Sequence, residues 1–350
     1  MSSLLEIAKR QLTLTTHRIH TLPVVVLMPH SRCDCRCVMC DIWKANRNKQ
    51  EISRDELARH TATFRQFSVR WVVLSGGEAL MHTNLWALCE LLKTLPVKIT
   101  LLSTGLLLKR HAPDVVRWCD EVIVSLDGSR EVHNAIRKVP HAYDRLAEGV
   151  AALKGLSVNF RVTARCVIQR RNYLDLPNVI KAAHAIGLDQ ISFLPVDVST
   201  PAFNRPTPWG NERVADVALS PNEVAEFERI LEQTITSCAE DFASGFITES
   251  PDKLRRLVRY FAALNGEGDF PKTVCNAPWV STVIETDGTV RPCFFHRPLG
   301  NIYQQSLDKI LNSADAIAFR RNLDVRKNTI CRKCVCALYL GPRKAVGYSG

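Results

Sequence analysis

The sequence contains no apolar stretch that approaches the roughly 20 residues needed to span a bilayer, so we predict no stable membrane insertion. Its first residues lack the short apolar block and the small-residue cleavage site of a secretory signal peptide. No internal repeat and no low-complexity tract is evident along its 350 residues. These absences argue against membrane, secreted and repeat proteins, and they favour a globular protein of one large or two ordinary domains in the cytoplasm.

Acidic residues are also few, with 35 aspartates and glutamates against 46 lysines and arginines, which gives a formal net charge of +11. Such a balance is typical either of a protein with an anionic substrate or partner or of one with a generally basic solvated surface. The basic residues are dispersed, and the densest runs, Lys44–Lys49 and Arg165–Arg171, are weakly interleaved with aromatic residues. Because no nucleic-acid-binding module has this pattern, we predict no nucleic-acid partner.

Cysteine, in contrast, is abundant. Thirteen cysteines in a chain without a secretory signal favour metal ligands over disulfides. Cys33, Cys37 and Cys40 have the spacing C-x3-C-x2-C just after the apolar run Leu22–Met28. Three such thiolates can hold a [4Fe–4S] cluster and leave its fourth iron without a protein ligand, open to a small molecule. Cys35 allows other triples, and a zinc knuckle or buried thiols are the alternatives.

Apolar segments alternate with amphipathic stretches from residue 23 to about residue 197. We predict strands at Leu22–Met28, Arg70–Leu74, Lys98–Leu102, Glu121–Leu126, Val158–Ile168 and Gln190–Val196, and helices at Ser53–Phe67, Asn84–Thr94 and Leu174–Ile186. This alternation indicates right-handed βαβ units and a parallel sheet.

Polar and glycine-bearing motifs follow the predicted strands, at the end where barrel-like α/β folds build their active sites. Gly76 and Gly77 allow the backbone to approach a ligand closely, and Glu78 can accept a hydrogen bond from an ammonium group. Farther along, hydroxyl and carboxylate groups at strand ends can bind ribose hydroxyls, a carboxylate or substrate. These residues are Ser103, Thr104, Ser125 and Asp127. An ordinary strand-to-helix turn and the capping of the next helices are the alternatives.

The cysteine spacing resembles the signature of the radical S-adenosylmethionine (SAM) superfamily, in which a large apolar or aromatic residue, here Met39, precedes the last cysteine. The resemblance implies that Cys33, Cys37 and Cys40 hold the cluster and that SAM chelates the open iron. It implies that Met39 packs near the adenine. It further implies that one electron, from a donor such as flavodoxin or ferredoxin, cleaves SAM to a 5′-deoxyadenosyl radical that abstracts hydrogen from a substrate.

Two further segments are similar to motifs of this superfamily. Gly76, Gly77 and Glu78 resemble its Gly-Gly-Glu motif, which receives the SAM amino group, although Ala79 stands where proline is usual. The run from Ser125 to Gly128, with His133 and Arg137 behind it, resembles a segment of members with a C-terminal cluster domain. Arg137 then either pairs with the SAM carboxylate or is a solvated helix residue.

The C-terminal part carries five cysteines within about sixty residues: Cys275, Cys293, Cys331, Cys334 and Cys336. A hairpin with its turn at Asp287-Gly288 brings the first two together, and a helix from Leu307 to about Asn322 precedes the others. By spacing alone, iron–sulfur and a zinc ribbon are equal alternatives, since zinc also binds four thiolates.

The whole C-terminal run resembles the SPASM/twitch domains of radical SAM enzymes. This resemblance implies one auxiliary [4Fe–4S] cluster held by Cys275, Cys293, Cys331 and Cys334, with Cys336 as a spare or alternative ligand.

The predicted fold class is α/β. The six strand–helix units resemble the partial (β/α)6 TIM-like barrel of radical SAM enzymes, which is open on one side, and the resemblance to SPASM/twitch domains implies a small C-terminal cysteine-rich α+β domain. We predict an N-terminal helical extension at 1–22, the barrel at 23–215, a helical linker at 216–265 and the auxiliary cluster domain at 266–350. The extension is expected to cap the barrel rather than anchor a membrane. Residues 199–210 are expected to form a linker or surface loop, and 221–264 two helices broken near Gly245.

The predicted function is that of a radical SAM enzyme acting on a small molecule, possibly anionic, such as a sugar, an aminocyclitol, a nucleotide or a lipid-linked intermediate. The first strand begins near residue 23, so no peptide-recognition or cobalamin domain is expected before the barrel. The auxiliary cluster assists electron transfer or substrate binding. A radical SAM peptide maturase is one alternative, and a non-enzymatic iron–sulfur or zinc protein is another.

Overall fold

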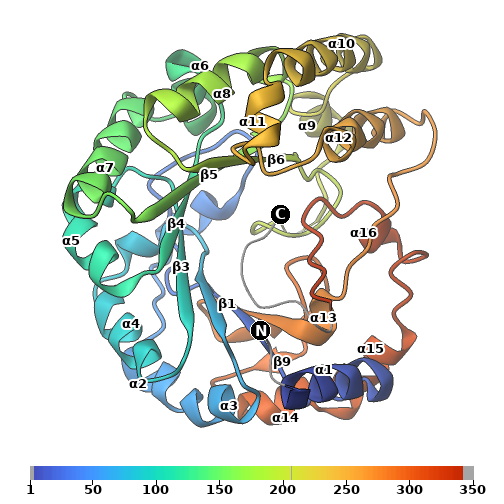
Figure 1. Ribbon diagram of the computed structural model, residues 1–350. Helices are drawn as coiled ribbons and strands as arrows, with labels where there is room; N and C mark the ends of the chain where they lie inside the picture. Colours follow the sequence, from blue (N-terminus) through green and yellow to red (C-terminus); the bar gives the residue numbers. More distant parts are fainter. Residues whose placement is uncertain (1–3, 206, 342–350) are drawn as a thin grey trace.

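The computed structural model describes residues 4–205 and 207–341, so the ends of the predicted terminal segments, 1–3 and 342–350, lie outside the described residues (Figure 1). Its scaffold is a nine-stranded sheet in the order β6-β5-β4-β3-β2-β1-β7-β8-β9. The strands are β1 Val24–Leu27, β2 Trp71–Leu74, β3 Lys98–Ser103, β4 Glu121–Ser125, β5 Arg161–Ile168, β6 Gln190–Pro195, β7 Ser281–Ile284, β8 Thr289–Arg291 and β9 Gly300–Asn301.

The first six strands pair in parallel and curve into a partial barrel, which confirms the predicted fold class. Figure 1 shows helices around the outside of this sheet. They are α2 Arg54–Ala58, α3 Thr61–Gln66, α4 Leu85–Lys93, α5 Leu108–Trp118, α6 Arg130–Arg137, α7 Ala142–Leu156 and α8 Leu176–Ala185. Because helices cover one face and the barrel interior the other, β1 and β2 are almost wholly apolar.

The C-terminal part continues the barrel sheet. β7 pairs in parallel with β1, in the register Val24 to Ser281, and β8 and β9 follow as antiparallel strands. Gly288 in the β7–β8 turn has a φ of +82°, which confirms the predicted hairpin turn. The predicted domain boundary near residue 266 therefore precedes a strand that is bonded to the barrel.

Two predicted helices are interrupted. The segment 53–67 forms two helices, because the Thr61 hydroxyl bonds the Ala58 carbonyl oxygen at 2.9 Å instead of continuing the first helix. Residues 307–322 also form two, α14 Leu307–Leu311 and α15 Ala314–Asn322, since Asn312 bonds the backbone of Ile19.

The region 221–264 forms three helices rather than two. They are α10 Pro221–Ser237, α11 Ala239–Ala243 and α12 Pro251–Leu264. The break expected near Gly245 is confirmed, with a φ of +75° at this glycine. The chain that follows lies along the outer edge of β6, where Thr248 N donates to the Ile191 carbonyl oxygen at 2.9 Å.

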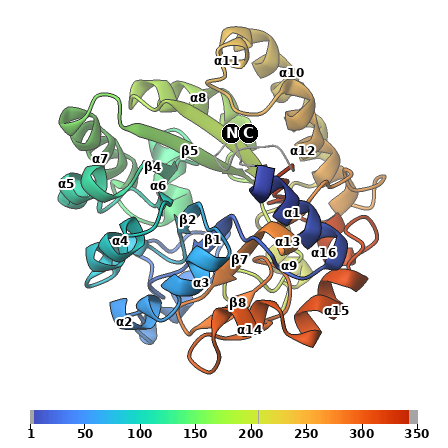
Figure 2. The ribbon, with the colours of Figure 1, turned by 60° about the horizontal axis from the view of Figure 1, so that its bottom comes forward.

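The N-terminal helix α1, Leu4–Thr16, lies against the C-terminal elements, including α13 Ala277–Val280 (Figure 2). Just beyond its end, the His17 carbonyl oxygen accepts from Arg320 Nε at 2.6 Å, and His17 Nδ1 lies 3.2 Å from Trp279 Nε1. Among the described helices, none combines the length and the apolar character that a membrane span requires.

Candidate active site and metal centres

A cavity of about 240 Å³ lies at the carboxyl ends of the barrel strands. Of the site residues predicted in the barrel, all but Glu78 and Asp127 line it: Cys33, Cys37, Met39, Cys40, Gly76, Gly77, Ser103, Thr104 and Ser125. They come from the loops or ends of four strands, because parallel strands place their carboxyl ends at one edge of the sheet. The structure therefore brings together residues that are up to ninety positions apart in the sequence.

The thiols of the first motif lie in unequal surroundings. Cys37 Sγ lies 3.4 Å from Arg137 Nη1. A hydrogen bond from Cys35 and the Arg137 charge lower the pKa of Cys37 to about 7, against the effect of burial. Hydrogen bonds with Cys33 and Cys37, followed by burial, raise the pKa of Cys35. Since metals bind thiolates, these surroundings suit Cys37 as a ligand and keep Cys35 a thiol.

Cys40 is different, because burial raises its pKa to about 12 while its sulfur accepts a hydrogen bond from Ile42 N at 3.4 Å. A bound metal ion deprotonates a coordinating thiol outright, so this pKa does not oppose ligation. Within residues 4–205 and 207–341, no three His, Cys, Asp or Glu side chains form a group that could hold a metal ion. A four-iron cluster does not need such a group, because its thiolates each bind a different iron.

The Gly76–Gly77 turn packs directly against the loop after β1 that carries Cys33, Cys37 and Cys40, which we call the cysteine loop. Gly76 has a φ of +110°, a conformation that residues with a side chain rarely adopt. A Cβ atom on Gly77 would collide with the Arg32 carbonyl oxygen, and Glu78 N donates to the same oxygen at 2.8 Å. Both glycines are therefore needed for the close approach of the two loops.

Glu78 is fully buried behind this turn and does not line the cavity. Its carboxylate accepts from Thr104 N at 2.6 Å, from Ser103 Oγ at 3.1 Å and from Leu80 N at 3.1 Å. Burial, followed by the charge of Asp34, raises the pKa of Glu78 to about 7. The side chain thus fixes the end of β3, and its contact with a SAM amino group stays a prediction.

Asp127 is also fully buried, and it forms an ion pair with Arg137. Its second oxygen accepts from Val167 N at 2.9 Å, and its own N–H donates to His133 Nδ1 at 3.1 Å. Asp127 therefore lies behind Arg137, which lines the cavity. Arg137 Nε is buried and has no hydrogen-bond partner in the described part of the chain, so the guanidinium can take a further acceptor such as a carboxylate.

The described residues of 199–210 form an irregular, partly exposed loop, as predicted, but this loop also buries side chains against the site. The strap, which we define as residues 197–213 with residue 206 outside the described part, lies across the cysteine loop. Arg205 Nη2 donates to the Met39 carbonyl oxygen at 3.2 Å and Trp209 Nε1 to Asp41 Oδ2 at 2.8 Å. Asp197 and Phe203, which line the cavity, were missed in the sequence. The position of Asp197 two residues after the end of β6, where the site residues of barrel folds lie, was the available signal.

The five C-terminal cysteines lie close together, as their mutual influence shows. Burial raises the pKa of Cys334, and Cys336, Cys275 and Cys293 raise it further. Burial, with smaller effects of Cys293 and Cys275, raises the pKa of Cys331 to about 12. The hairpin and the last cysteines thus form a second thiol-rich site.

Two contacts of this second thiol-rich site were not expected from the sequence. His296 Nε2 lies 3.2 Å from Cys331 Sγ, a contact that the sequence did not indicate. Val335, between Cys334 and Cys336, lines the first cavity. The C-terminal segment therefore supplies part of the wall of the barrel site.

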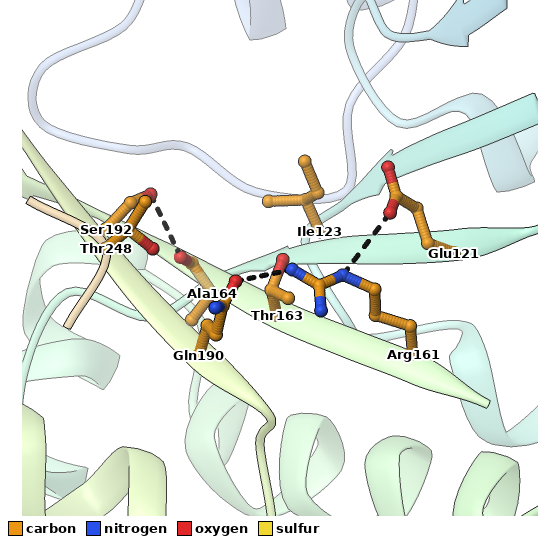
Figure 3. Close-up of a pocket in the computed structure, with 8 residues that line it drawn as sticks. All are labelled: Glu121, Ile123, Arg161, Thr163, Ala164, Gln190, Ser192 and Thr248. Atoms are coloured by element: carbon orange, nitrogen blue, oxygen red, sulfur yellow. Dashed lines mark hydrogen bonds and ion pairs between the residues drawn. The ribbon is translucent and has the colours of Figure 1, made fainter. Parts of the chain in front are cut away.

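A much smaller polar cavity, of about 20 Å³, opens between β4, β5 and β6 (Figure 3). Arg161 extends there between Glu121, at 3.5 Å, and Gln190. Arg161, Thr163 and Ala164 of β5 line this cavity, whereas Val167, farther along the same strand, lines the larger one. Because its charged groups are paired with each other, this cavity fits a structural role.

Two family models match the sequence, the radical SAM superfamily over residues 27–183 and the SPASM iron–sulfur cluster-binding domain over residues 275–335. Residues 27–183 therefore carry a radical SAM domain, and a SPASM domain follows at 275–335. The first domain implies SAM with its [4Fe–4S] cluster, and the second implies auxiliary iron–sulfur clusters.

Curated relatives match mainly over the barrel. A pre-heme d1 synthase of Dinoroseobacter shibae is 28% identical over 173 residues, 48% of this chain and 42% of that protein. A probable GTP 3′,8-cyclase of Methanococcus maripaludis is 29% identical over 180 residues, 47% of this chain and 57% of that protein. The antilisterial bacteriocin subtilosin biosynthesis protein AlbA of Bacillus subtilis is 22% identical over 81% of this chain and 58% of its own length. The chain spans about half the length of these relatives.

Solved structures share the fold over nearly the whole chain. Streptococcus suis SuiB bound to its precursor peptide SuiA has a TM-score of 0.63 at 15% identity, covering 93% of this chain and 73% of that one. The anSMEcpe structure with bound AdoMet and the Cp18Cys peptide has a TM-score of 0.61 at 20% identity, covering 89% and 87%.

Replacing Gly77 with alanine should disrupt the first site, because the added Cβ meets a backbone oxygen that cannot move aside. We expect iron in the anaerobically reconstituted protein to fall from about eight to about four per chain, since only the first cluster should be lost. Gly155→Ala, in α7, is the matched control, because a Cβ there meets no atom within 4 Å. Full iron content in Gly77→Ala would contradict this packing argument.

His133 should make stability depend on pH. Burial and the Arg137 charge lower its pKa to about 3, from 6.5 when unfolded, so the folded protein keeps this ring neutral. Its contribution is complete above pH 6.5 and is lost as the pH falls from 6.5 toward 3. The unfolding free energy of the parent protein should therefore fall more steeply than that of His133→Asn, by up to about 1.4 kcal/mol per pH unit. Urea unfolding between pH 7 and 4 measures this, and parallel profiles would refute it.

Proposed function

We propose that this chain is a radical SAM enzyme that binds a [4Fe–4S] cluster through Cys33, Cys37 and Cys40 and uses it to cleave SAM. When bound, the cluster and SAM supply one-electron chemistry that generates a 5′-deoxyadenosyl radical, which abstracts hydrogen from a substrate. The observation that carries the proposal is the single cavity that joins the three cysteines with the Gly76–Gly77 turn and the ends of β3 and β4.

Different residues of the cavity would bind different parts of SAM. Arg137 offers a buried guanidinium to a carboxylate in the cavity, and Asp127 holds that guanidinium in place. Ser103 and Ser125 offer hydroxyl groups from neighbouring strand ends. Apolar side chains suited to an adenine and to the exclusion of water complete the wall: Met39, Leu102, Val167, Leu194, Val196 and Val335.

At the second site, Cys275, Cys293, Cys331 and Cys334 would hold one auxiliary [4Fe–4S] cluster, with Cys336 as an alternative ligand. We propose that it assists electron transfer or substrate binding, which is supported by the presence of Val335 in the wall of the first cavity. An external donor such as flavodoxin or ferredoxin would supply the electron for SAM cleavage. We propose a cytoplasmic location, where reducing conditions keep these thiols available.

A small molecule, possibly anionic, is the substrate class that we propose. The relatives that match over the barrel include a probable GTP 3′,8-cyclase and a pre-heme d1 synthase, which supports this choice. A peptide is the second candidate. It is favoured by the similarity to the subtilosin biosynthesis protein over 81% of this chain.

Anaerobic reconstitution tests the proposal. The parent protein should bind about eight irons per chain and release 5′-deoxyadenosine from SAM only when a reductant is added. Cys37→Ala should abolish this product, Cys334→Ala should retain part of it, and Cys238→Ala, outside both sites, should retain all of it. Zinc in place of iron, or normal SAM cleavage by Cys37→Ala, would exclude the assignment.

A further inference from the structure

Arg205, in the strap, is a buried arginine whose side chain is held by an ion pair and by an aromatic ring. Its side chain is 1% exposed and pairs with Asp197, itself 2% exposed, at 2.8 Å. Its guanidinium lies 3.8 Å from the centre of the Trp209 ring. Burying an arginine costs free energy even when the arginine is paired with a carboxylate. We therefore asked which nearby group a buried positive charge at this position would serve.

Arg205 contacts the cysteine loop. Arg205 Nη2 donates to the carbonyl oxygen of Met39, the residue directly before Cys40. Because this oxygen belongs to the peptide that joins Met39 to Cys40, the hydrogen bond holds the guanidinium beside the last cysteine of the motif. Arg205 Nε, like Arg137 Nε, is a buried donor for which the described residues provide no acceptor.

We propose that Arg205 is a positioning residue for the cluster at Cys33, Cys37 and Cys40, which fixes the Met39–Cys40 peptide and holds a positive charge beside Cys40. This inference rests on the proposed function, because it requires a cluster in that loop. Arg205 then places a positive charge next to Cys40, as Arg137 does next to Cys37. Asp197, in the cavity wall, partly neutralises the charge of Arg205.

The charge has a consequence for the reduction potential. Reduction adds one negative charge to a cluster, and a nearby cation stabilises the reduced form more than the oxidised form. Removing the cation should lower the potential, whereas removing the carboxylate that moderates it should raise it. Arg205 and Asp197 are therefore expected to shift the potential in opposite directions, which a general loosening of the strap would not do.

The test is an anaerobic, EPR-monitored redox titration of the reconstituted protein with dithionite, following the reduced-cluster signal that added SAM perturbs. Arg205→Gln should shift its midpoint to more negative potential and Asp197→Asn to more positive potential. Arg205→Lys, which keeps the charge, should lie between Arg205→Gln and the parent. Arg229→Gln is the matched control for charge, because Arg229 is exposed on α10 and should cause no shift.

Midpoints of both variants equal to that of the parent, or shifts in the same direction, would overturn the inference. If Arg205→Gln does not retain the first cluster, Asp197→Asn decides alone: a more positive midpoint supports the role of Arg205, and an unchanged one overturns it. A parent protein with no SAM-perturbed signal would refute the proposed function instead, so the two failures are distinguishable.

Discussion

The close approach of two backbone segments is the constraint on which the site depends. The turn after β2 and the cysteine loop after β1 touch through Gly77 and the Arg32 carbonyl oxygen, with no space for a side chain between them. Adjacent parallel strands bring these loops to the same edge of the sheet, and glycine lets them meet. The geometry of the three thiols is thereby tied to the register of the barrel itself.

Buried charge is arranged around this contact in pairs. Arg137 is held by Asp127, and Arg205 is held by Asp197, so each guanidinium enters the protein interior with a carboxylate partner. Each arginine also contacts the cysteine loop, Arg137 at Cys37 and Arg205 at Met39. The positive charge that these pairs place beside the thiols suits a group that carries negative charge from its thiolates and sulfides.

The C-terminal region is physically continuous with the barrel. β7 bonds to β1 along its whole length, and Val335 reaches the wall of the barrel cavity. The aromatic ring of Phe203, in the strap, packs near Phe294 and Phe295, which follow Cys293. Residues that neighbour the second thiol site therefore form part of the wall of the first cavity or pack against residues that do.

Local sequence patterns determined the α/β class, the parallel pairing of the sheet, the cysteine triad and the glycine turn. They did so because apolar periodicity, ligand spacing and backbone freedom are properties of neighbouring residues. Only the tertiary structure decided that Glu78 and Asp127 lie behind the cavity, that the strap lies across the cysteine loop, and that β7 extends the barrel. These outcomes depend on which distant segments share buried space, and a carboxylate at a strand end has the same local sequence whether it faces a ligand or an arginine.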